Sequence, residues 1–172
     1  RDDWPYGMAV DGSGNICVTG ISWGSSWSDT DILTTKYDPM GNEVWTRTYN
    51  GPGNTYDLAW DVEADASDHV YVTGASWDGK SPDYITIKYY PNGDTAWVRR
   101  YNGPGGDYDE SYAIAVDSSG NVYVTGLSYN MLTDLDYATI KYYPNGDTAW
   151  VRIYNGQGNM ADAAFDITVD GT

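Results

Sequence analysis

Short stretches of alternating apolar and polar residues, each ended by a turn rich in Gly, Pro, Asn and Asp, dominate the hydrophobic pattern of this chain. In one of several similar segments, residues 112–116 alternate and end at the turn 117–121, and the β-branched run 122–125 follows. After a loop come residues 137–143, a second tight turn at 144–147, and residues 149–154. Alternation with period two between turn formers predicts four antiparallel strands, which we label A to D. Because no segment shows convincing 3.6-residue periodicity, we expect almost no helix.

The same four-strand unit is written three times, and a fourth copy begins before residue 172. Asp11, Asp65, Asp117 and Asp170 are equivalent, and subtraction of their positions gives steps of 54, 52 and 53 residues. All differences in length between the copies fall between strands B and C. Loops tolerate insertions and carry function more often than the elements that they join. We therefore look for binding residues near the B–C loops.

Four-stranded units repeated at about 40 to 50 residues are typical of β-propeller blades. A parallel β-helix is the rival fold, but its coils are usually shorter and are not built from tight hairpins. In a propeller, strand A lies innermost and strand D outermost. The A–B and C–D turns then share one face, and the B–C loops and D–A connections share the other, which we call the loop face.

Two sequence runs carry a family resemblance. The run AIAVDSSGNVYVTG at 113–126, followed by DYATIKYYPNGDTAWVR at 136–152, resembles the β-propeller repeat known as SBBP, of bacterial and archaeal proteins. The resemblance extends over essentially the whole chain, three times. It implies a propeller, classically seven-bladed, in large extracellular or surface proteins, and it implies no reaction. The second copy departs most, because Asp68 and His69 stand where Gly and Asn are usual.

The repeat fixes the expected boundaries. Residues 1–172 form one repeat domain or propeller fragment, with blade 1 at about 4–51, blade 2 at about 58–103, blade 3 at about 110–156 and an extra strand A at about 163–172. Three blades cannot close a ring, since typical propellers have four to eight. We expect either a fragment of a longer propeller or copies that associate into a six-bladed ring or a larger assembly. Open blade faces and unpaired strand edges favour association in both cases.

Composition narrows the classes of partner. The formal net charge of −16 argues against binding nucleic acid through its phosphates, and no apolar run approaches the length of a membrane span. The negative charge suits an extracellular or cell-surface protein. Arg1 is not a natural start residue, so the chain reads as a processed or excised piece. The single Cys17 occupies the place of Tyr71 and Tyr123, and we expect a half-buried strand residue there.

Residues that resemble catalytic groups fall on repeated structural positions. His69 is the only histidine, and its equivalents are the turn residues Asn15 and Asn121, so we interpret it as a turn residue. Six of the nine basic residues repeat on strands C and D: Lys36, Lys88, Lys141, Arg47, Arg99 and Arg152. Since Trp150 and Tyr154 flank Arg152 on one strand face, we expect packing and cation–π contacts from these arginines.

Two sets of repeated aspartates lie near the loop face and are the candidate metal ligands. They are Asp31, Asp83 and Asp136 at the start of strand C, and Asp57, Asp109 and Asp162 before strand A. Clustered carboxylates with backbone carbonyls suit Ca²⁺, although no EF-hand spacing is present. The alternative is that these aspartates cap turns and accept backbone N–H bonds between blades.

Aromatic residues at the entrance to the B–C loop are the candidate ligand-binding group. Trp23, Trp77 and Tyr129 are equivalent, and Trp27 is unrepeated. Exposed aromatics beside Asp and Asn could stack on sugar rings, since aromatics are enriched in binding sites. The alternative is packing against neighbouring blades or loops.

The favoured function is a non-catalytic scaffold or recognition module of an extracellular or cell-surface protein, which binds protein or carbohydrate through the loop face. The competing class is a carboxylate-based glycan hydrolase or lyase, although no carboxylate pair stands out from the repeat background. A third class is purely architectural, in which blades stack into a surface layer or filament.

Overall fold

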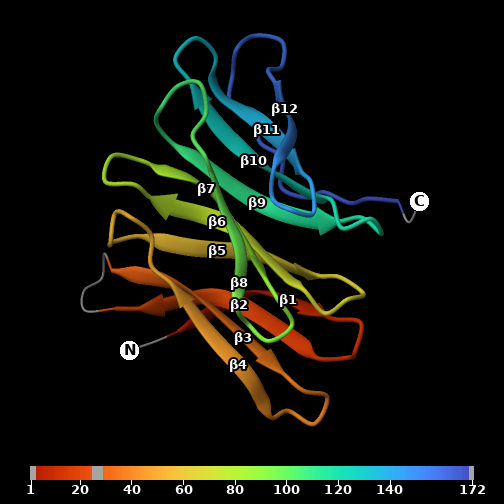
Figure 1. Cartoon of the computed structure of the whole chain (residues 1–172). Helices are drawn as coiled ribbons and strands as arrows, with labels where there is room; N and C mark the ends of the chain where they lie inside the picture. The colour runs from red at the N-terminus through yellow and green to blue at the C-terminus, as the bar shows by residue number, and fades with distance from the viewer. Residues whose placement is uncertain (1–2, 25–28, 171–172) are drawn as a thin grey trace.

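The computed structural model describes residues 3–24 and 29–170, and within them the chain forms twelve β-strands and no helix (Figure 1). The all-β expectation is confirmed. The described residues therefore contain no helix that could span a membrane. Each sheet has four antiparallel strands in sequence order. Sheet 1 contains β1 (Trp4–Val10), β2 (Ile16–Trp23), β3 (Thr30–Tyr37) and β4 (Glu43–Tyr49); sheet 2 contains β5 (Asp57–Ala64), β6 (Val70–Trp77), β7 (Pro82–Tyr89) and β8 (Thr95–Tyr101); sheet 3 contains β9 (Asp109–Val116), β10 (Val122–Asn130), β11 (Asp134–Tyr142) and β12 (Thr148–Tyr154).

A side chain closes each turn between the first and second strands. In sheet 1, the Asp11 carboxylate accepts the N–H groups of Ser13 at 3.0 Å and Asn15 at 2.8 Å. The turn of sheet 2 has the same form despite its unusual sequence, because Asp68 adopts the positive φ of 66° that glycine supplies elsewhere. His69 donates its N–H to Asp65 at 3.0 Å in this turn. Its interpretation as a turn residue is confirmed.

Three equivalent glycines allow the first strand of each sheet to lie very close to the second. A Cβ built on Gly74 would lie 1.9 Å from the main-chain oxygen of Leu58, and Gly20 and Gly126 have the same environment at 2.0 Å. The ladder shifts register beside each of these glycines. A side chain here would collide with backbone, so the bulge requires glycine.

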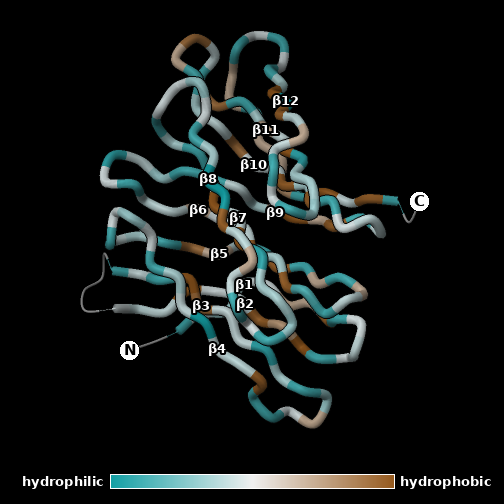
Figure 2. Tube along the Cα trace, viewed as in Figure 1, coloured by the Kyte–Doolittle hydropathy of each residue, from teal (hydrophilic) through white to brown (hydrophobic). Residues whose placement is uncertain are grey.

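Two hydrophobic cores fill the boundaries between the sheets. One face of sheet 1, with Cys17, Ile32 and Trp45, packs on sheet 2 residues that include Val72 and Ile87. The same face of sheet 2, with Tyr71, Tyr84 and Trp97, packs on sheet 3. Figure 2 shows hydrophobic segments interspersed with polar ones along the strands, as alternation requires. Cys17 is fully buried, so the expectation of half burial is wrong: sheet 2 covers this face.

A row of aromatic rings connects equivalent positions on the first strands of successive sheets, β1, β5 and β9. Tyr6 and Trp60 lie 4.8 Å apart, Trp60 and Tyr112 lie 6.3 Å apart, and Phe165 stacks on Tyr112 at 5.3 Å between ring centroids. Phe165 thus continues the row that Tyr6, Trp60 and Tyr112 form on the first strands. However, residues 163–170 form no strand, which corrects the expected extra strand at 163–172; residues 171–172 lie outside the described part. The physical reason is that the described chain holds no second strand with which this segment could form a ladder.

Candidate functional site at the loop face

The predicted loop aromatics pack on glycines of the connections between sheets. The main-chain oxygen of Trp77 accepts the N–H of Gly53 at 3.0 Å, and Tyr129 accepts that of Gly105 at 3.0 Å. A Cβ on either glycine would lie 2.7 Å from Cδ1 of its aromatic partner. Both rings therefore press on the loop backbone and remain half-buried. Trp23 contacts Trp4 edge to face at 6.1 Å, and Trp27 lies outside the described residues.

The candidate metal ligands hold the same connections in place. The Oδ2 atoms of Asp57 and Asp109 each accept a glycine N–H at 2.6 Å, from Gly51 and Gly103 respectively. Asp162 accepts the N–H of Gly156 in the same way at 2.5 Å. All three aspartates accept a backbone N–H, and Asp57 and Asp109 do so in the connections between two sheets, as the alternative expectation describes.

The second aspartate set has individual partners. Asp83 forms an ion pair with Arg100 at 3.0 Å, and Asp136 accepts the Thr133 hydroxyl at 2.6 Å. One buried oxygen, Oδ1, lacks a hydrogen bond of good geometry in each of Asp31, Asp83 and Asp136. Across residues 3–24 and 29–170, no three carboxylate, histidine or cysteine side chains are grouped as a metal site requires. This does not test Ca²⁺ binding in solution, so the Ca²⁺ site stays a prediction.

Burial changes the titration of these carboxylates. Burial raises the pKa of Asp109 to about 6, against the lowering effect of Ser128 and Gly103. Burial also raises the pKa of Asp57 and of Asp83, and Arg100 partly opposes the rise at Asp83. The folded state consequently binds protons on this face more tightly than the unfolded chain does.

We predict that Asp109→Asn removes part of the pH dependence of stability. Since the folded pKa of Asp109 exceeds the unfolded value, stability from this group is complete below about pH 4 and falls by about 2 to 3 kcal/mol as the pH rises to about 6. Urea denaturation of both proteins between these pH values measures the difference. Asp107→Asn, at an exposed neighbouring position, is the control. Equal pH slopes in the wild type and the Asp109 variant would contradict the prediction.

A second aromatic group, which the sequence did not single out, surrounds Glu110 at the loop-face end of β9. We call Tyr6, Trp60, Tyr108, Glu110 and Tyr112 the Glu110 cluster. Glu110 is 3% exposed. It accepts the indole N–H of Trp60 at 2.5 Å, the hydroxyl of Tyr112 at 3.1 Å and the hydroxyl of Tyr108. The donors come from two sheets and one connecting loop.

The Glu110 cluster combines a saturated carboxylate with exposed rings. Burial, together with Glu110, raises the pKa of Tyr108 and Tyr112, so both phenols stay protonated near neutrality. Tyr6 and Tyr108 are 41% and 40% exposed. A buried carboxylate that already accepts three hydrogen bonds is poorly placed for acid–base work. The arrangement instead presents oriented aromatic surface, which suits stacking on a ligand.

No local signal linked these residues in the sequence. Glu110 is an unrepeated carboxylate, and Trp60 precedes it by 50 positions. The repeat aligns Trp60 with Tyr112, but alignment alone does not reveal that the first strands of successive sheets lie side by side with their rings in contact.

The basic repeat positions contact the neighbouring sheet. Arg47 and Arg99 lie over Trp45 and Trp97 at 5.9 and 5.8 Å from the ring centroids, which confirms the expected cation–π contact. Each arginine also donates Nε–H to a glycine carbonyl in the next sheet, Gly93 at 2.8 Å and Gly146 at 2.6 Å. The sequence pattern alone does not reveal this second role.

Comparison with known proteins agrees with the repeat. Residues 96–131 match the SBBP family, described as a β-propeller repeat, which confirms the resemblance drawn from the sequence. The chain is also 28% identical over 135 residues to a protein of Caulobacter vibrioides named regulatory protein FlaEY. The alignment covers 70% of this chain but 13% of that relative, so the chain corresponds to a small part of its length.

Proposed function

We propose that this chain is a non-catalytic β-propeller module of an extracellular or cell-surface protein, and that it recognises a partner through its loop face. In this proposal the three sheets are three propeller blades with β1, β5 and β9 innermost. The SBBP match and the row of rings across the inner strands support this arrangement.

The observation that carries the recognition role is the Glu110 cluster. Its half-exposed rings are fixed by hydrogen bonds to a buried carboxylate, so they lose little entropy when a ligand binds. Flat rings beside hydroxyl groups suit a carbohydrate, whose apolar ring face can stack on an aromatic side chain. Because Glu110 already accepts three hydrogen bonds, the cluster favours binding over hydrolysis.

A glycan array with the purified chain tests this proposal, followed by titration of the strongest glycan. Tyr108→Ala is expected to weaken binding at least tenfold, because it removes an exposed ring and one donor to Glu110. Tyr143→Ala is the matched control, since Tyr143 is 51% exposed in a turn on the opposite face. Failure to bind any glycan, or equal weakening by both variants, would count against carbohydrate recognition. Cleavage of a bound glycan would replace the proposal with an enzyme.

A further inference from the structure

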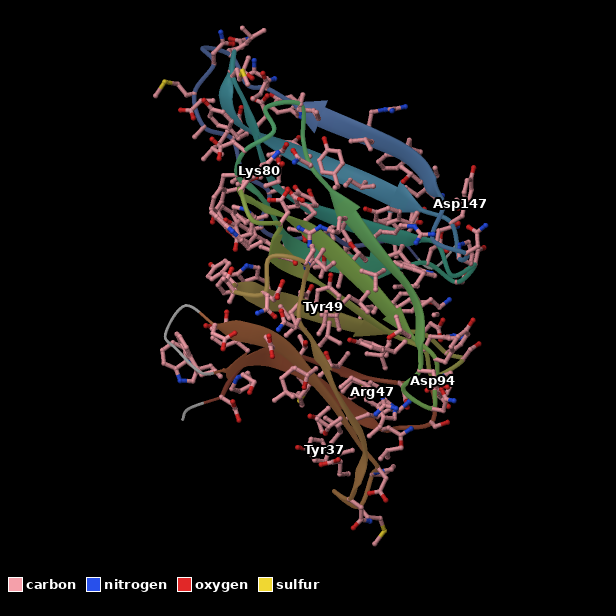
Figure 3. The ribbon with its side chains drawn as sticks, turned by 60° about the vertical axis from the view of Figure 1, so that its left-hand side comes forward. Tyr37, Arg47, Tyr49, Lys80, Asp94 and Asp147 are labelled. Atoms are coloured by element: carbon pink, nitrogen blue, oxygen red, sulfur yellow. The ribbon has the colours of Figure 1, made fainter. Side chains whose placement is uncertain are left out.

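The same pair of side chains, a tryptophan and an arginine, closes both boundaries between the sheets. Trp45 donates its indole N–H to the main-chain oxygen of Pro91 at 3.0 Å, and Trp97 does so to Pro144 at 3.1 Å. The neighbouring arginine of each pair reaches a glycine carbonyl in the same turn, and Figure 3 shows Arg47 beside the turn that carries Asp94. We call this pair of side chains on one turn the Trp–Arg clasp.

The clasp requires a glycine in the turn to which it binds. A Cβ built on Gly93 would lie 2.8 Å from Cγ of Trp45, and a Cβ on Gly146 would lie 2.8 Å from Cγ of Trp97. Both glycines are buried under the indole. The clasp therefore fits only a turn with glycine at this position.

Sheet 3 carries a third clasp that is formed but unoccupied among the described residues. Arg152 lies over Trp150 at 5.6 Å, close to the geometry of the two occupied clasps. Its Nη1 donates to the carbonyl of Val151 at 2.8 Å, as Arg47 and Arg99 do to Thr46 and Val98. Arg152 is exposed, whereas the occupied arginines are half-buried. The side chains are thus already oriented toward a turn.

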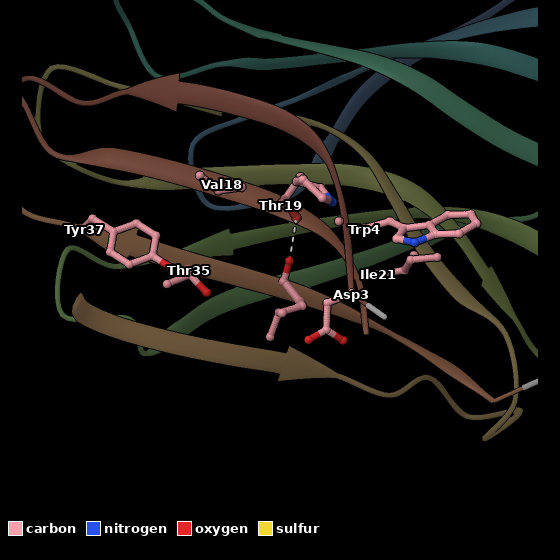
Figure 4. Close-up of a pocket in the computed structure, with 10 residues that line it drawn as sticks. Asp3, Trp4, Val18, Thr19, Ile21, Thr35 and Tyr37 are labelled. Carbon is pink, nitrogen blue, oxygen red and sulfur yellow. Dashed lines mark hydrogen bonds between the residues drawn. The ribbon is translucent and has the colours of Figure 1, made fainter. Parts of the chain in front are cut away.

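Sheet 1 carries the matching turn, also unoccupied. Pro39 and Gly41 align with Pro91 and Gly93, and a Cβ built on Gly41 would meet nothing within 4 Å. The sheet face beside this turn is also open: Val18, Thr35 and Tyr37 line a pocket of about 240 Å³ (Figure 4). The equivalents of Val18, Leu33, Thr35 and Tyr37 in the other sheets are no more than 2% exposed, namely Val72, Ile85, Ile87, Tyr89, Val124, Ala138, Ile140 and Tyr142.

We propose that the chain binds a second copy of itself, head to tail, through the clasp Trp150–Arg152 on one copy and the turn 38–42 on the other. The occupant is a second copy because one chain carries both halves of an interface that it already uses twice internally. Such an interface is heterologous, so two copies joined at both ends close a ring of six sheets, and unclosed ends continue the chain.

A second copy can bind only if one segment leaves the face of sheet 3. Residues 163–170 lie where β1 of the incoming copy would stand, as the stack of Phe165 on Tyr112 shows. β1 is held by six paired positions on β2, whereas residues 163–170 have no ladder. The 163–170 segment is therefore the one released, and it competes with the second copy for the face of sheet 3.

Sedimentation velocity over a range of concentrations tests the proposal on the full chain. The wild type is expected to form a dimer or longer oligomers as concentration rises. Two variants are each expected to stay monomeric: Trp150→Ala with Arg152→Ala, which removes the clasp, and Gly41→Asn, which places a side chain under the indole. Asn is chosen because it tolerates the positive φ of 84° at Gly41.

Mixing the two variants provides the decisive control. The Gly41 variant keeps its clasp and the double variant keeps its turn, so together they should form a one-to-one heterodimer that grows no further. Cooperative urea unfolding of each monomeric variant would show that both variants fold. A wild type that stays monomeric at every concentration, or oligomers that persist in both variants, would overturn the proposal. Phe165→Ala should strengthen association, because it loosens the competing segment.

Discussion

Replacement of Trp97 with Ala is expected to lower the free energy of unfolding by about 3 to 5 kcal/mol. Trp97 is 8% exposed and belongs to the core between sheets 2 and 3. The change removes a large ring from this core, leaves the oxygen of Pro144 without its indole donor and uncovers Gly146. It also deprives Arg99 of the ring over which it lies.

Urea denaturation at a concentration at which the chain is monomeric measures this loss. Trp150→Ala is the matched control, because it makes the same chemical change at the equivalent position on the open face of sheet 3. Its expected cost is below about 1 kcal/mol, since no neighbouring sheet covers the ring. If both variants lost the same stability, the Trp side chain would be stabilising its own sheet and not the boundary.

The second large effect is expected from Lys36→Met. Nζ of Lys36 lies 2.5 Å from the Asp11 carboxylate, and the two side chains are 2% and 0% exposed. Lys36 also donates to the main-chain oxygen of Asp68 in sheet 2 at 3.1 Å. Removal of one partner leaves a buried charge, which typically costs about 3 to 5 kcal/mol.

Two comparisons isolate the ion pair. Lys141→Met, at the equivalent half-buried position of sheet 3, should cost little, because there Tyr123 donates to Asp117 at 3.0 Å and the lysine lies over the ring. Lys36→Met combined with Asp11→Asn should cost less than Lys36→Met alone, because no uncompensated charge remains. A double variant no more stable than Lys36→Met would show that the unpaired charge is not the main cause of the loss.

The pair also has a defined pH dependence. Burial alone raises the pKa of Asp11, but hydrogen bonds from Lys36 and Asn15 outweigh it and hold the pKa below its usual value. The stability that the pair contributes is thus complete above about pH 4 and is lost as the pH falls through the folded pKa. This sign is opposite to that of Asp109.

The ion pair shows how far the repeat can be read from the sequence. Alignment indicates that Cys17 replaces a tyrosine and that Lys36 repeats on strand C. It does not show that Lys36 can reach Asp11 because the tyrosine hydroxyl is absent at position 17. In sheets 2 and 3 a tyrosine hydroxyl reaches the aspartate, at 2.8 Å from Tyr71 to Asp65, and the lysine is displaced onto the ring. With the smaller Cys17, the lysine of sheet 1 reaches Asp11 directly.

The sequence by itself determined the twelve strands, the turns and the equivalence of positions such as Trp45, Trp97 and Trp150. These follow from interactions between residues close in the chain: alternation of side chains along a strand, and turns closed by Asp, Asn and Gly. Only the tertiary structure decided which repeats contact one another, and through which atoms. The Trp–Arg clasp and the Glu110 cluster join residues 46 to 50 positions apart, and such contacts depend on how sheets stack, which no local pattern encodes.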